Sequence, residues 1–563
     1  METQSTESRA GGAWYTIAKS AAIVSGIFVL LLSTLIIVNY LQVRTIDPLN
    51  SDALTQLMQQ HRQEPGNESL KEQIRALDLL ARKAYFTHQW QLRIGSYLLF
   101  GSVLVFLGAL KHLSSLRTSL PDLSRERSQE WAWEERILAR KGLLFTGLGL
   151  FAAAFVLSVV SEEQTSPVDP TASGSAFPSA EEIRAQWPTF RGPEGNGIAY
   201  ASGIPTHWDG PSGDHILWKV PVPKPGYGSP ILWEGKLFLS GADQTVQEVY
   251  CYDAGSGDLL WQGQANDLPG SPPERPDVTD DTGYAAPTMA TDGQRVYAVY
   301  ATGDVACWDM DGTRLWGRNL GVPDNHYGHS SSLMTHRNLL LVQLDDNVGG
   351  LLLGLDARTG SQVYEVDRDV QISWASPILV NTGSRMEFIL NANPLVISHD
   401  PLTGRELWRV DCMMGEVAPS PAYADGMVFV VNEYARLAAI KVSGQAEMVW
   451  EYDDNLAEVA SPVATSEYLV VATSFGAVAC YESKTGEELW LHDFDEGFYA
   501  SPILVGELVY LMDMNGLMHI FRLGREFRQI AECPLGERAM ATPAFADGRI
   551  YIRGMEHLYC VGE

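Results

Sequence analysis

The chain of 563 residues is too long for one hydrophobic core, and its composition predicts two regions of different character. Its 69 Asp and Glu residues outnumber 40 Lys and Arg residues, which gives a formal net charge of −29. This acidic balance argues against nucleic acid or anionic lipid as a ligand of the C-terminal region, because both are repelled by negative charge.

Long apolar runs dominate residues 1–163, which we expect to form a membrane anchor of three transmembrane helices at about 16–39, 92–113 and 143–160. The run from Ser20 to Val38 carries no charge and is long enough to cross a bilayer. A cleaved signal peptide is the alternative for this run. Its length, its polar lead of 19 residues and its lack of a small-x-small exit argue against that alternative.

The distribution of cations predicts the orientation of the anchor. The loop between the second and third predicted helices is rich in Lys and Arg, whereas none follows Val160 until Arg184. Positive loops stay in the cytoplasm. We therefore expect a multi-pass protein of the bacterial inner (cytoplasmic) membrane, with its C-terminal region on the periplasmic or extracytoplasmic side.

Apolar residues at helical spacing predict an extracytoplasmic helical hairpin at 48–90, with Glu64-Pro-Gly-Asn67 at its bend. This hairpin is interpreted either as a spacer or as a docking site for a partner. Residues 164–186 are rich in Ser, Pro, Ala and Glu, a composition that indicates a flexible linker.

From residue 187 to 563 one phrase returns eight times, at intervals of 40 to 45 residues from its second copy onward. Each copy begins with a short hydroxyl or proline step that leads into a β-like run. This period, filled with four short strands, predicts an all-β eight-bladed propeller. The openings are Ser229-Pro230, Ala286-Pro287, Ser331-Ser332, Ser376-Pro377, Ser420-Pro421, Ser461-Pro462, Ser501-Pro502 and Thr542-Pro543.

An Asp-x-x-Thr-Gly turn precedes a large ring in most copies, as in Asp356-Ala-Arg-Thr-Gly360. We expect these rings to pack between adjacent blades and to donate their indole N–H to a neighbouring carbonyl. Ile530 takes this place in the seventh copy. The predicted docking residues are Trp218, Trp261, Trp316, Trp408, Trp450 and Trp490.

The last copy stops at Tyr559-Cys-Val-Gly-Glu563, before a fourth strand. The segment Ile216-Leu-Trp218-Lys-Val220 precedes the first copy and has the pattern of the missing strand. We therefore expect this segment to close the eighth blade, which removes the open sheet edges.

The repeat resembles that of the quinoprotein-type, PQQ-binding-like propeller family, since the Gly-His…Trp-Asp pairs of WD propellers and the glycine pairs of kelch propellers do not recur. The segment Trp187-Pro-Thr-Phe-Arg191-Gly-Pro-Glu-Gly-Asn-Gly197 is also similar to the start of a bacterial group of such proteins. The resemblance implies the propeller fold without fixing a reaction.

Four of the six cysteines, Cys251, Cys307, Cys480 and Cys560, occupy the same position of the repeat. Other copies have Gly354, Ser398 or Ala439 there, so the position selects a small buried residue. We therefore expect free buried thiols rather than disulfides.

The residues just before each hydroxyl step are expected to line the mouth of the axial funnel. They form a largely aromatic ring with charged neighbours, which either binds a flat ligand, a sugar or a peptide loop, or simply plugs the axis. The candidate ligand-binding residues are Tyr227, Tyr284, Tyr327, Trp374, Glu416, Glu458, Tyr499 and Arg538.

Two functions from different classes remain open. The first is a membrane-anchored binding or scaffolding platform in the cell envelope, as in the outer-membrane assembly lipoprotein that shares this repeat. The second is implied by the resemblance and supported by the predicted anchor. It is a PQQ-dependent dehydrogenase that oxidises a sugar or alcohol and passes electrons to membrane quinone, with Asp324, Asn325 and Glu416 on a Ca ion. Partners would be the lipid bilayer, other envelope proteins or a small molecule at the funnel, but no nucleic acid.

Overall fold

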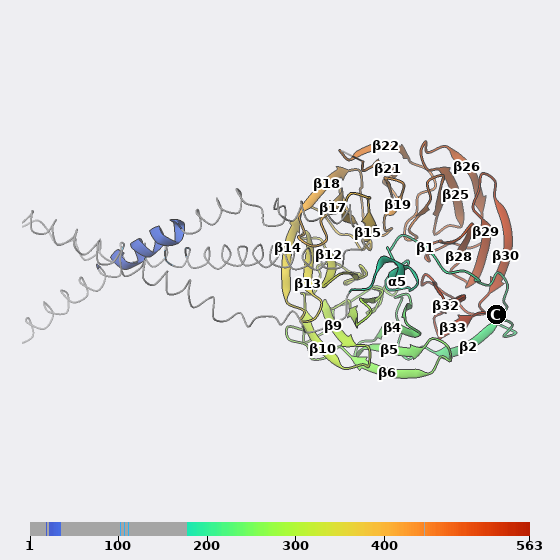
Figure 1. The fold of residues 1–563 in the computed structure, drawn as a ribbon, viewed down its shortest axis with the longest axis horizontal. Helices are drawn as coiled ribbons and strands as arrows, with labels where there is room; N and C mark the ends of the chain where they lie inside the picture. The colour runs from blue at the N-terminus through green and yellow to red at the C-terminus, as the bar shows by residue number, and fades with distance from the viewer. Residues whose placement is uncertain are drawn as a thin grey trace, which may run out of the picture. The chain divides into compact units, whose positions relative to one another are not determined.

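Short apolar runs that alternate with tight turns fold into eight antiparallel sheets, arranged radially as the blades of a propeller (Figure 1). The computed structural model describes residues 177–443 and 445–563, a helical stretch at 22–34 with residue 19, and single helical residues at 99, 102, 106, 108 and 111. The chain divides into the units Met1–Gly174 and Ser175–Glu563.

Only parts of the first two predicted membrane helices fall among the described residues. The third predicted helix at 143–160, the hairpin at 48–90 and residues 164–176 of the predicted linker lie outside them. Within the described part of the chain, no helix combines the length and the apolar character that a membrane crossing requires.

The first four blades each hold four strands in sequence order. Blade 1 comprises β3 (Ile231–Trp233), β4 (Lys236–Ala242), β5 (Gln247–Asp253) and β6 (Leu259–Gln264). Blade 2 comprises β7 (Ala290–Thr291), β8 (Arg295–Val299), β9 (Asp304–Asp309) and β10 (Arg314–Asn319). Blade 3 comprises β11 (Met334–His336), β12 (Leu339–Asp345), β13 (Gly350–Asp356) and β14 (Gln362–Arg368). Blade 4 comprises β15 (Ile378–Asn381), β16 (Met386–Asn391), β17 (Leu395–His399) and β18 (Glu406–Asp411).

The last four blades include the two strands that precede the repeats. Blade 5 comprises β19 (Ala422–Ala424), β20 (Met427–Val431), β21 (Leu437–Lys441) and β22 (Glu447–Tyr452). Blade 6 comprises β23 (Val463–Ala464), β24 (Tyr468–Ala472), β25 (Ala477–Glu482) and β26 (Glu488–Asp493). Blade 7 comprises β27 (Ile503–Val505), β28 (Leu508–Met512), β29 (Leu517–Arg522) and β30 (Arg528–Pro534), and β1 (Ile198–Ala199) adds to β27 in parallel. Blade 8 comprises β31 (Ala544–Ala546), β32 (Arg549–Arg553), β33 (His557–Val561) and β2 (Ile216–Pro221).

The predicted closure of the ring is confirmed, because β2 pairs with β33 and completes blade 8. Trp218 lies opposite Cys560, and Lys219 lies opposite Tyr559. The indole N–H of Trp218 donates to the carbonyl of Ala254 in blade 1 at 3.1 Å. Strand β2 therefore completes the last blade and also connects it to the first blade.

The aromatic ring on each outer strand bonds to the next blade in most repeats. Trp408 is the exception, since its N–H donates to the carboxylate of Glu387 in its own blade at 2.6 Å. Tyr364 takes the ring's place in blade 3, and its hydroxyl donates to the Pro401 carbonyl. The remaining N–H bonds run from Trp261 to Met310, Trp316 to Ala357, Trp450 to Ser483, and Trp490 to Gly524, at 2.9 to 3.0 Å.

A small residue on the third strand faces each of these rings. Gly354 pairs with Tyr364, and a Cβ atom at Gly354 would lie 2.3 Å from that ring. The other pairs are Cys251 with Trp261, Cys307 with Trp316, Ser398 with Trp408, Ala439 with Trp450, Cys480 with Trp490, and Cys560 with Trp218. All six cysteines are free and buried, as expected.

In blade 7 the larger residue of this pair is on the third strand and the smaller one is on the fourth strand. Its third strand carries the buried Ile520, and the residue opposite is Ala531. The prediction that Ile530 stands in the place of the ring is therefore wrong by one residue. A larger third-strand side chain fills the volume that the ring occupies elsewhere.

A belt of side-chain hydroxyls joins the inner strands around the axis. Each hydroxyl accepts a hydrogen bond from the backbone N–H of the equivalent residue in the preceding blade, at 2.9 to 3.1 Å. The repeated hydroxyl step is thus explained by an interblade bond that satisfies a buried donor. From Ser229 as the first donor, the acceptors run in order through Thr288, Ser332, Ser376, Ser420, Ser461, Ser501 and Thr542.

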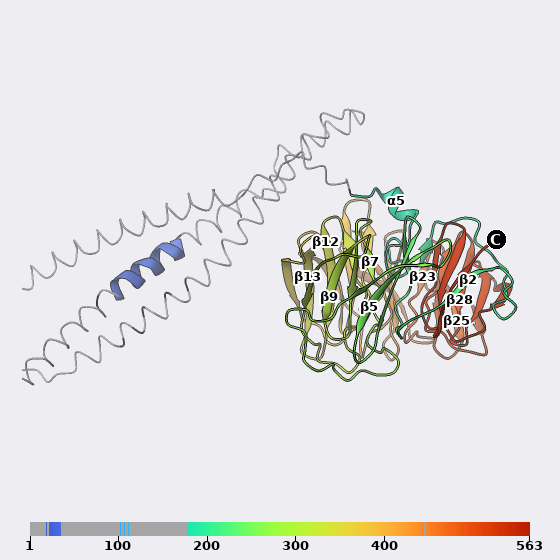
Figure 2. The ribbon, with the colours of Figure 1, turned by 90° about the horizontal axis from the view of Figure 1, so that it is seen from below.

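The segment 187–199 crosses one end of the axis and bonds to successive blades; we call this end the plug face. Residues 177–186, which belong to the predicted linker, contain the short helix α5 (Ala180–Arg184), and it lies over the same end (Figure 2). The backbone contacts join Trp187 with Leu232, Pro188 with Thr291, Glu194 with Leu379, and Gly197 with Leu504, and the Asn196 side chain bonds the backbone of Tyr423 in both directions.

Arg191 lies at the centre of this plug and is fully buried. Its guanidinium donates to the carbonyl of Pro421 in blade 5 at 3.0 Å and to that of Pro462 in blade 6. Burial lowers the pKa of Arg191 to about 9. The segment therefore acts as a hub that reaches the inner edges of blades on every side of the axis.

Candidate functional site

The end of the axis opposite the plug face carries the predicted aromatic ring; we call it the funnel face. Tyr227, Trp374 and Tyr499 lie two residues before the residues of the hydroxyl belt in blades 1, 4 and 7. Tyr284 and Tyr327 stand four and five residues before their hydroxyls at Thr288 and Ser332. Their predicted place at the strand start is wrong, because these two tyrosines belong to the longer connections between blades.

The connection between blades 1 and 2 reaches over the funnel face. The Tyr227 hydroxyl donates to the Asp280 carbonyl at 2.7 Å. The Thr279 N–H donates to the His326 carbonyl at 3.1 Å, and the Thr282 hydroxyl donates to the Tyr327 carbonyl at 3.1 Å. Residues 279–282 thus bridge blade 1 and the connection that leads into blade 3.

Asp281 brings a negative charge close to three tyrosines of the ring. Its carboxylate raises the pKa values of Tyr227, Tyr327 and Tyr499, in each case after the larger effect of burial. These three tyrosines come from blades 1, 3 and 7. Sequence reasoning missed Asp281, because the connection in which it lies is not part of the repeat.

Tyr327, Trp374 and Glu416 form the best-defined contact group of the predicted ring. The ring centroids of Tyr327 and Trp374 lie 4.2 Å apart, and the Tyr327 hydroxyl donates to Glu416 Oε2 at 3.1 Å. Burial, followed by the charge of Glu416, raises the pKa of Tyr327 to about 12. The ring centroids of His326 and Tyr327 lie 4.0 Å apart, so His326 packs against the same contact group.

The other predicted ring members are linked more loosely to this group. Arg538 lies close enough to Tyr227 to lower the pKa of its phenol, although burial and acidic neighbours dominate. Tyr284 packs instead against Arg275, whose guanidinium carbon lies 5.9 Å from the ring centroid. Glu458 lies beside Glu433, and burial together with that carboxyl raises the pKa of Glu458 to about 7.

The predicted metal ligands are engaged in local hydrogen bonds. Asn325 Oδ1 accepts from the Tyr327 N–H at 2.9 Å, and the Asp324 N–H donates to Asp346 at 3.0 Å. Glu416 accepts from the Tyr327 hydroxyl. The single set of three His, Cys, Asp or Glu residues with ligand atoms within 4.8 Å of one another, among described residues, contains neither Asp324 nor Glu416.

Tyr327 and Trp374 leave no room for PQQ between their faces. Two rings that enclose a planar ligand must stand about 7 Å apart, twice the ordinary carbon–carbon contact distance. Tyr327 and Trp374 lie at 4.2 Å and leave no such space.

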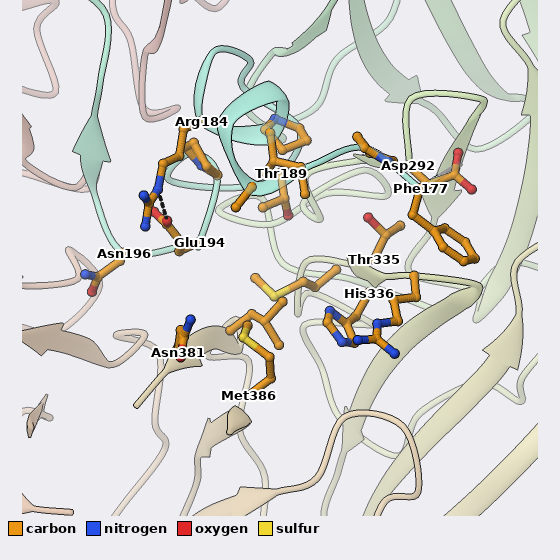
Figure 3. A pocket seen from close by; sticks show the side chains of 18 of the residues that line it. Phe177, Arg184, Thr189, Glu194, Asn196, Asp292, Thr335, His336, Asn381 and Met386 are labelled. Atoms are coloured by element: carbon orange, nitrogen blue, oxygen red, sulfur yellow. Dashed lines mark hydrogen bonds and ion pairs between the residues drawn. The ribbon is translucent and has the colours of Figure 1, made fainter. Parts of the chain in front are cut away.

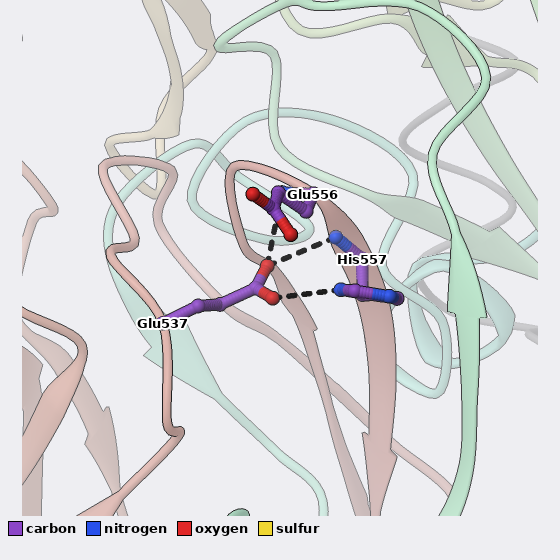
Figure 4. A group of neighbouring side chains, drawn as sticks. All are labelled: Glu537, Glu556 and His557. Carbon is purple, nitrogen blue, oxygen red and sulfur yellow. Dashed lines mark hydrogen bonds and ion pairs between the residues drawn. The ribbon is translucent and has the colours of Figure 1, made fainter.

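The set of three is Glu537, Glu556 and His557, near the seam between blades 7 and 8 (Figure 4). Both oxygens of Glu537 are already used as acceptors. Oε1 accepts the N–H groups of Glu556 and His557 at 3.0 and 2.9 Å, and Oε2 accepts the Tyr559 hydroxyl at 3.0 Å and lies 2.7 Å from His557 Nδ1. This arrangement ties the hairpin between β32 and β33 to the preceding connection.

A second concave region lies on the plug face, with a volume of about 530 Å³ (Figure 3). It is bordered by α5, the segment that contains Glu194, and the inner hairpins of blades 2 to 4. Arg184 Nε lies 3.0 Å from Glu194 Oε1, and the Tyr200 hydroxyl donates to Glu194 Oε2 at 3.0 Å. Sequence reasoning missed this pocket, because the residues around α5 were interpreted as a linker.

Several polar side chains that line this pocket are already hydrogen-bonded within the protein. Asn196 uses both its amide oxygen and nitrogen on Tyr423, and Asn381 Oδ1 accepts the Gly383 N–H. The Arg184 guanidinium also stacks over the Tyr200 ring at 5.1 Å. Asn196 and the contacts of Glu194 therefore help to fix the plug in place.

The sequence matches the family described as outer membrane protein assembly factor BamB over residues 202–349, 247–384, 348–466 and 455–525. No curated protein matches the chain. Among solved structures, the fold is similar to a quinohemoprotein alcohol dehydrogenase from Comamonas testosteroni, with a TM-score of 0.51, 11% identity, and coverage of 69% of this chain and 83% of that chain. BamB from Moraxella catarrhalis has a TM-score of 0.47, 14% identity, and coverage of 62% and 97%.

Proposed function

This chain belongs to the PQQ-like repeat family described as outer membrane protein assembly factor BamB, and we propose that its propeller is a binding and scaffolding platform of the cell envelope. The description of that family, an assembly factor, is consistent with a protein that holds other proteins rather than transforms a small molecule.

The observation that supports the proposal is that one segment of the chain crosses the plug end of the propeller axis and another bridges connections at the funnel end. Arg191 and its neighbours bond across the plug face, and residues 279–282 bridge blades across the funnel face. Within the ring, the Tyr227 hydroxyl donates to the Asp280 carbonyl of the bridging segment, and Tyr327 packs against Trp374. The side chains of the exposed loops are therefore the groups that we expect to contact a macromolecular partner.

Photo-crosslinking tests the platform function. A photoreactive amino acid is placed at Tyr434, an exposed hairpin position on the funnel face, and at Leu491, exposed on the outer strand β26 as the matched control. We expect discrete crosslinked proteins in native membranes from position 434 and none from position 491. Equal or absent capture at both positions would contradict the proposal. Oxidation of sugars or alcohols by the pure protein with added PQQ and Ca²⁺ would instead show that the protein is an enzyme.

We further propose that the propeller is held at the bacterial inner membrane with its loops on the extracytoplasmic side. The uncharged run at 20–38 and the cations between 111 and 141 support this orientation. Because all six native cysteines are buried, the exposed position Ser212 offers a clean labelling site.

In spheroplasts, a membrane-impermeant maleimide should label Ser212→Cys without lysis, while the wild-type chain stays unlabelled. Labelling of Ser212→Cys that requires lysis would place the propeller in the cytoplasm and refute this orientation.

A further inference from the structure

Two hairpins of neighbouring blades border an open cleft on the funnel face. The hairpin between β20 and β21 supplies Glu433 and Tyr434, and the hairpin between β24 and β25 supplies Phe475. The connection that follows β22 adds Asp453 and Asp454 to the lining. The cleft has a volume of about 590 Å³.

Two large aromatic side chains project from this cleft into solvent. Tyr434 is 79% exposed and Phe475 is 76% exposed, and each is the third residue of its hairpin loop. Elsewhere in the propeller the hairpin loops keep most of their large apolar side chains more covered, with Met555 at 43%. Paired exposed aromatic groups that border a concavity are typical of a contact surface.

All charged residues that line the cleft are acidic. Its lining includes the carboxylates of Glu433, Asp453 and Asp454 and contains no Lys, Arg or His. Arg436, the cation nearest in sequence on the same hairpin, is paired with Glu451. The aromatic faces and the carboxylates together complement a cationic group that carries apolar neighbours.

We propose that this cleft binds an extended, arginine-rich and apolar segment of a partner protein. The guanidinium groups contact the carboxylates and the faces of Tyr434 and Phe475, while the apolar residues cover the rest of the exposed rings. The inference rests on the proposed platform function and names the chemistry of the partner.

Glu458, beside the cleft, gives the binding a pH dependence. The groups that face it are the Glu433 carboxyl and the phenols of Tyr434 and Tyr499. Burial and Glu433 raise the pKa of Glu458 to about 7, so the carboxyl pair holds a proton below that pH and releases it above. A bound guanidinium favours the ionised pair, and the affinity should therefore rise between pH 6 and pH 8.

Fluorescence anisotropy with the full chain in detergent tests the cleft. The probe is a labelled eight-residue peptide of alternating arginine and leucine, and the control peptide replaces each arginine with glutamate. The double variant Tyr434→Ser, Phe475→Ser should bind the arginine peptide roughly 5- to 30-fold more weakly, from the loss of two exposed cation–π contacts. Val348→Ser is the matched control, since Val348 is 83% exposed at the third position of the equivalent loop in blade 3.

Unchanged affinity in the double variant, equal loss in Val348→Ser, or tight binding of the glutamate peptide would each overturn the inference. Glu458→Gln should also remove most of the rise in affinity between pH 6 and pH 8. The platform function is judged separately by crosslinking from position 434. If partners crosslink there yet the arginine peptide binds no better than the glutamate peptide, the partner chemistry is wrong and the platform function stands.

Discussion

The close approach between a turn glycine and the preceding blade's ring predicts a large cost for one added methyl group. Gly360 has a φ of +68°, and a Cβ atom there would lie 2.5 and 2.7 Å from two ring carbons of Trp316. Gly360→Ala therefore has two penalties. The left-handed backbone costs an alanine about 1–2 kcal/mol, and the overlap with a packed ring adds about 1–3 kcal/mol.

Gly383 separates these two contributions, because it has a φ of +82° with no atom within 4 Å of the added Cβ. Gly383→Ala should lower the free energy of unfolding by the backbone cost alone, about 1–2 kcal/mol. Gly360→Ala should lower it by about 2–5 kcal/mol.

Urea unfolding of the full chain, followed by tryptophan fluorescence, measures both changes. The background variant Trp316→Leu removes the overlap, so in that background Gly360→Ala should cost no more than Gly383→Ala. Equal losses for the two glycine variants in the wild-type background would refute the claim that the ring selects glycine at position 360.

Three further changes test other parts of the fold. Ser461→Ala leaves the buried N–H of Ser420 without its acceptor and should destabilise the protein by about 1–3 kcal/mol in urea unfolding. Burial lowers the pKa of His399 to about 4, below its usual value, so the unfolded chain takes up a proton first as pH falls. Stability should therefore drop by up to about 3 kcal/mol between pH 6.5 and pH 4, and less in His399→Gln. Cys480→Leu places a larger side chain opposite Trp490 and should lower the thermal midpoint by several degrees, about 1–3 kcal/mol.

The repeat was predictable because its chemistry is local and recurs. The small residue of the third strand and the ring of the fourth strand lie nine to eleven residues apart, and the sheet register brings them together, as with Cys251 and Trp261. Where blade 7 departs from the rule, the register shows that Ile520 and Ala531 exchange sizes. A pattern of single positions cannot show such an exchange, because it depends on the pair.

The funnel ring was predictable only in part. Tyr227, Trp374 and Tyr499 have the expected relation to their hydroxyls, whereas Tyr284 and Tyr327 lie in longer connections. Counting back from a motif assumes a fixed path, and a connection of variable length breaks that assumption. The same reasoning explains why the sequence alone did not indicate the carboxylate that the connection between blades 1 and 2 brings close to the ring.

The plug illustrates contacts that no periodicity can reveal. Arg191 reaches carbonyl groups more than 200 residues away, and its segment occurs only once in the chain. Its sequence does contain a signal in the spacing of Gly192, Gly195 and Gly197, each of which adopts a positive φ. Such glycines predict a chain that turns sharply among close neighbours, but they do not say which neighbours.

The two faces of the propeller therefore have different tasks. The plug face carries the short turns of the repeat together with a segment that bonds across the axis, so much of this face is engaged in contacts within the fold. The funnel face carries the hairpins and connections that differ from blade to blade, and a closed ring leaves no sheet edge free for pairing. A partner must then be recognised by side chains on these loops. Tyr434 and Phe475, which the fold leaves almost uncovered, are the side chains of this face best placed to do so.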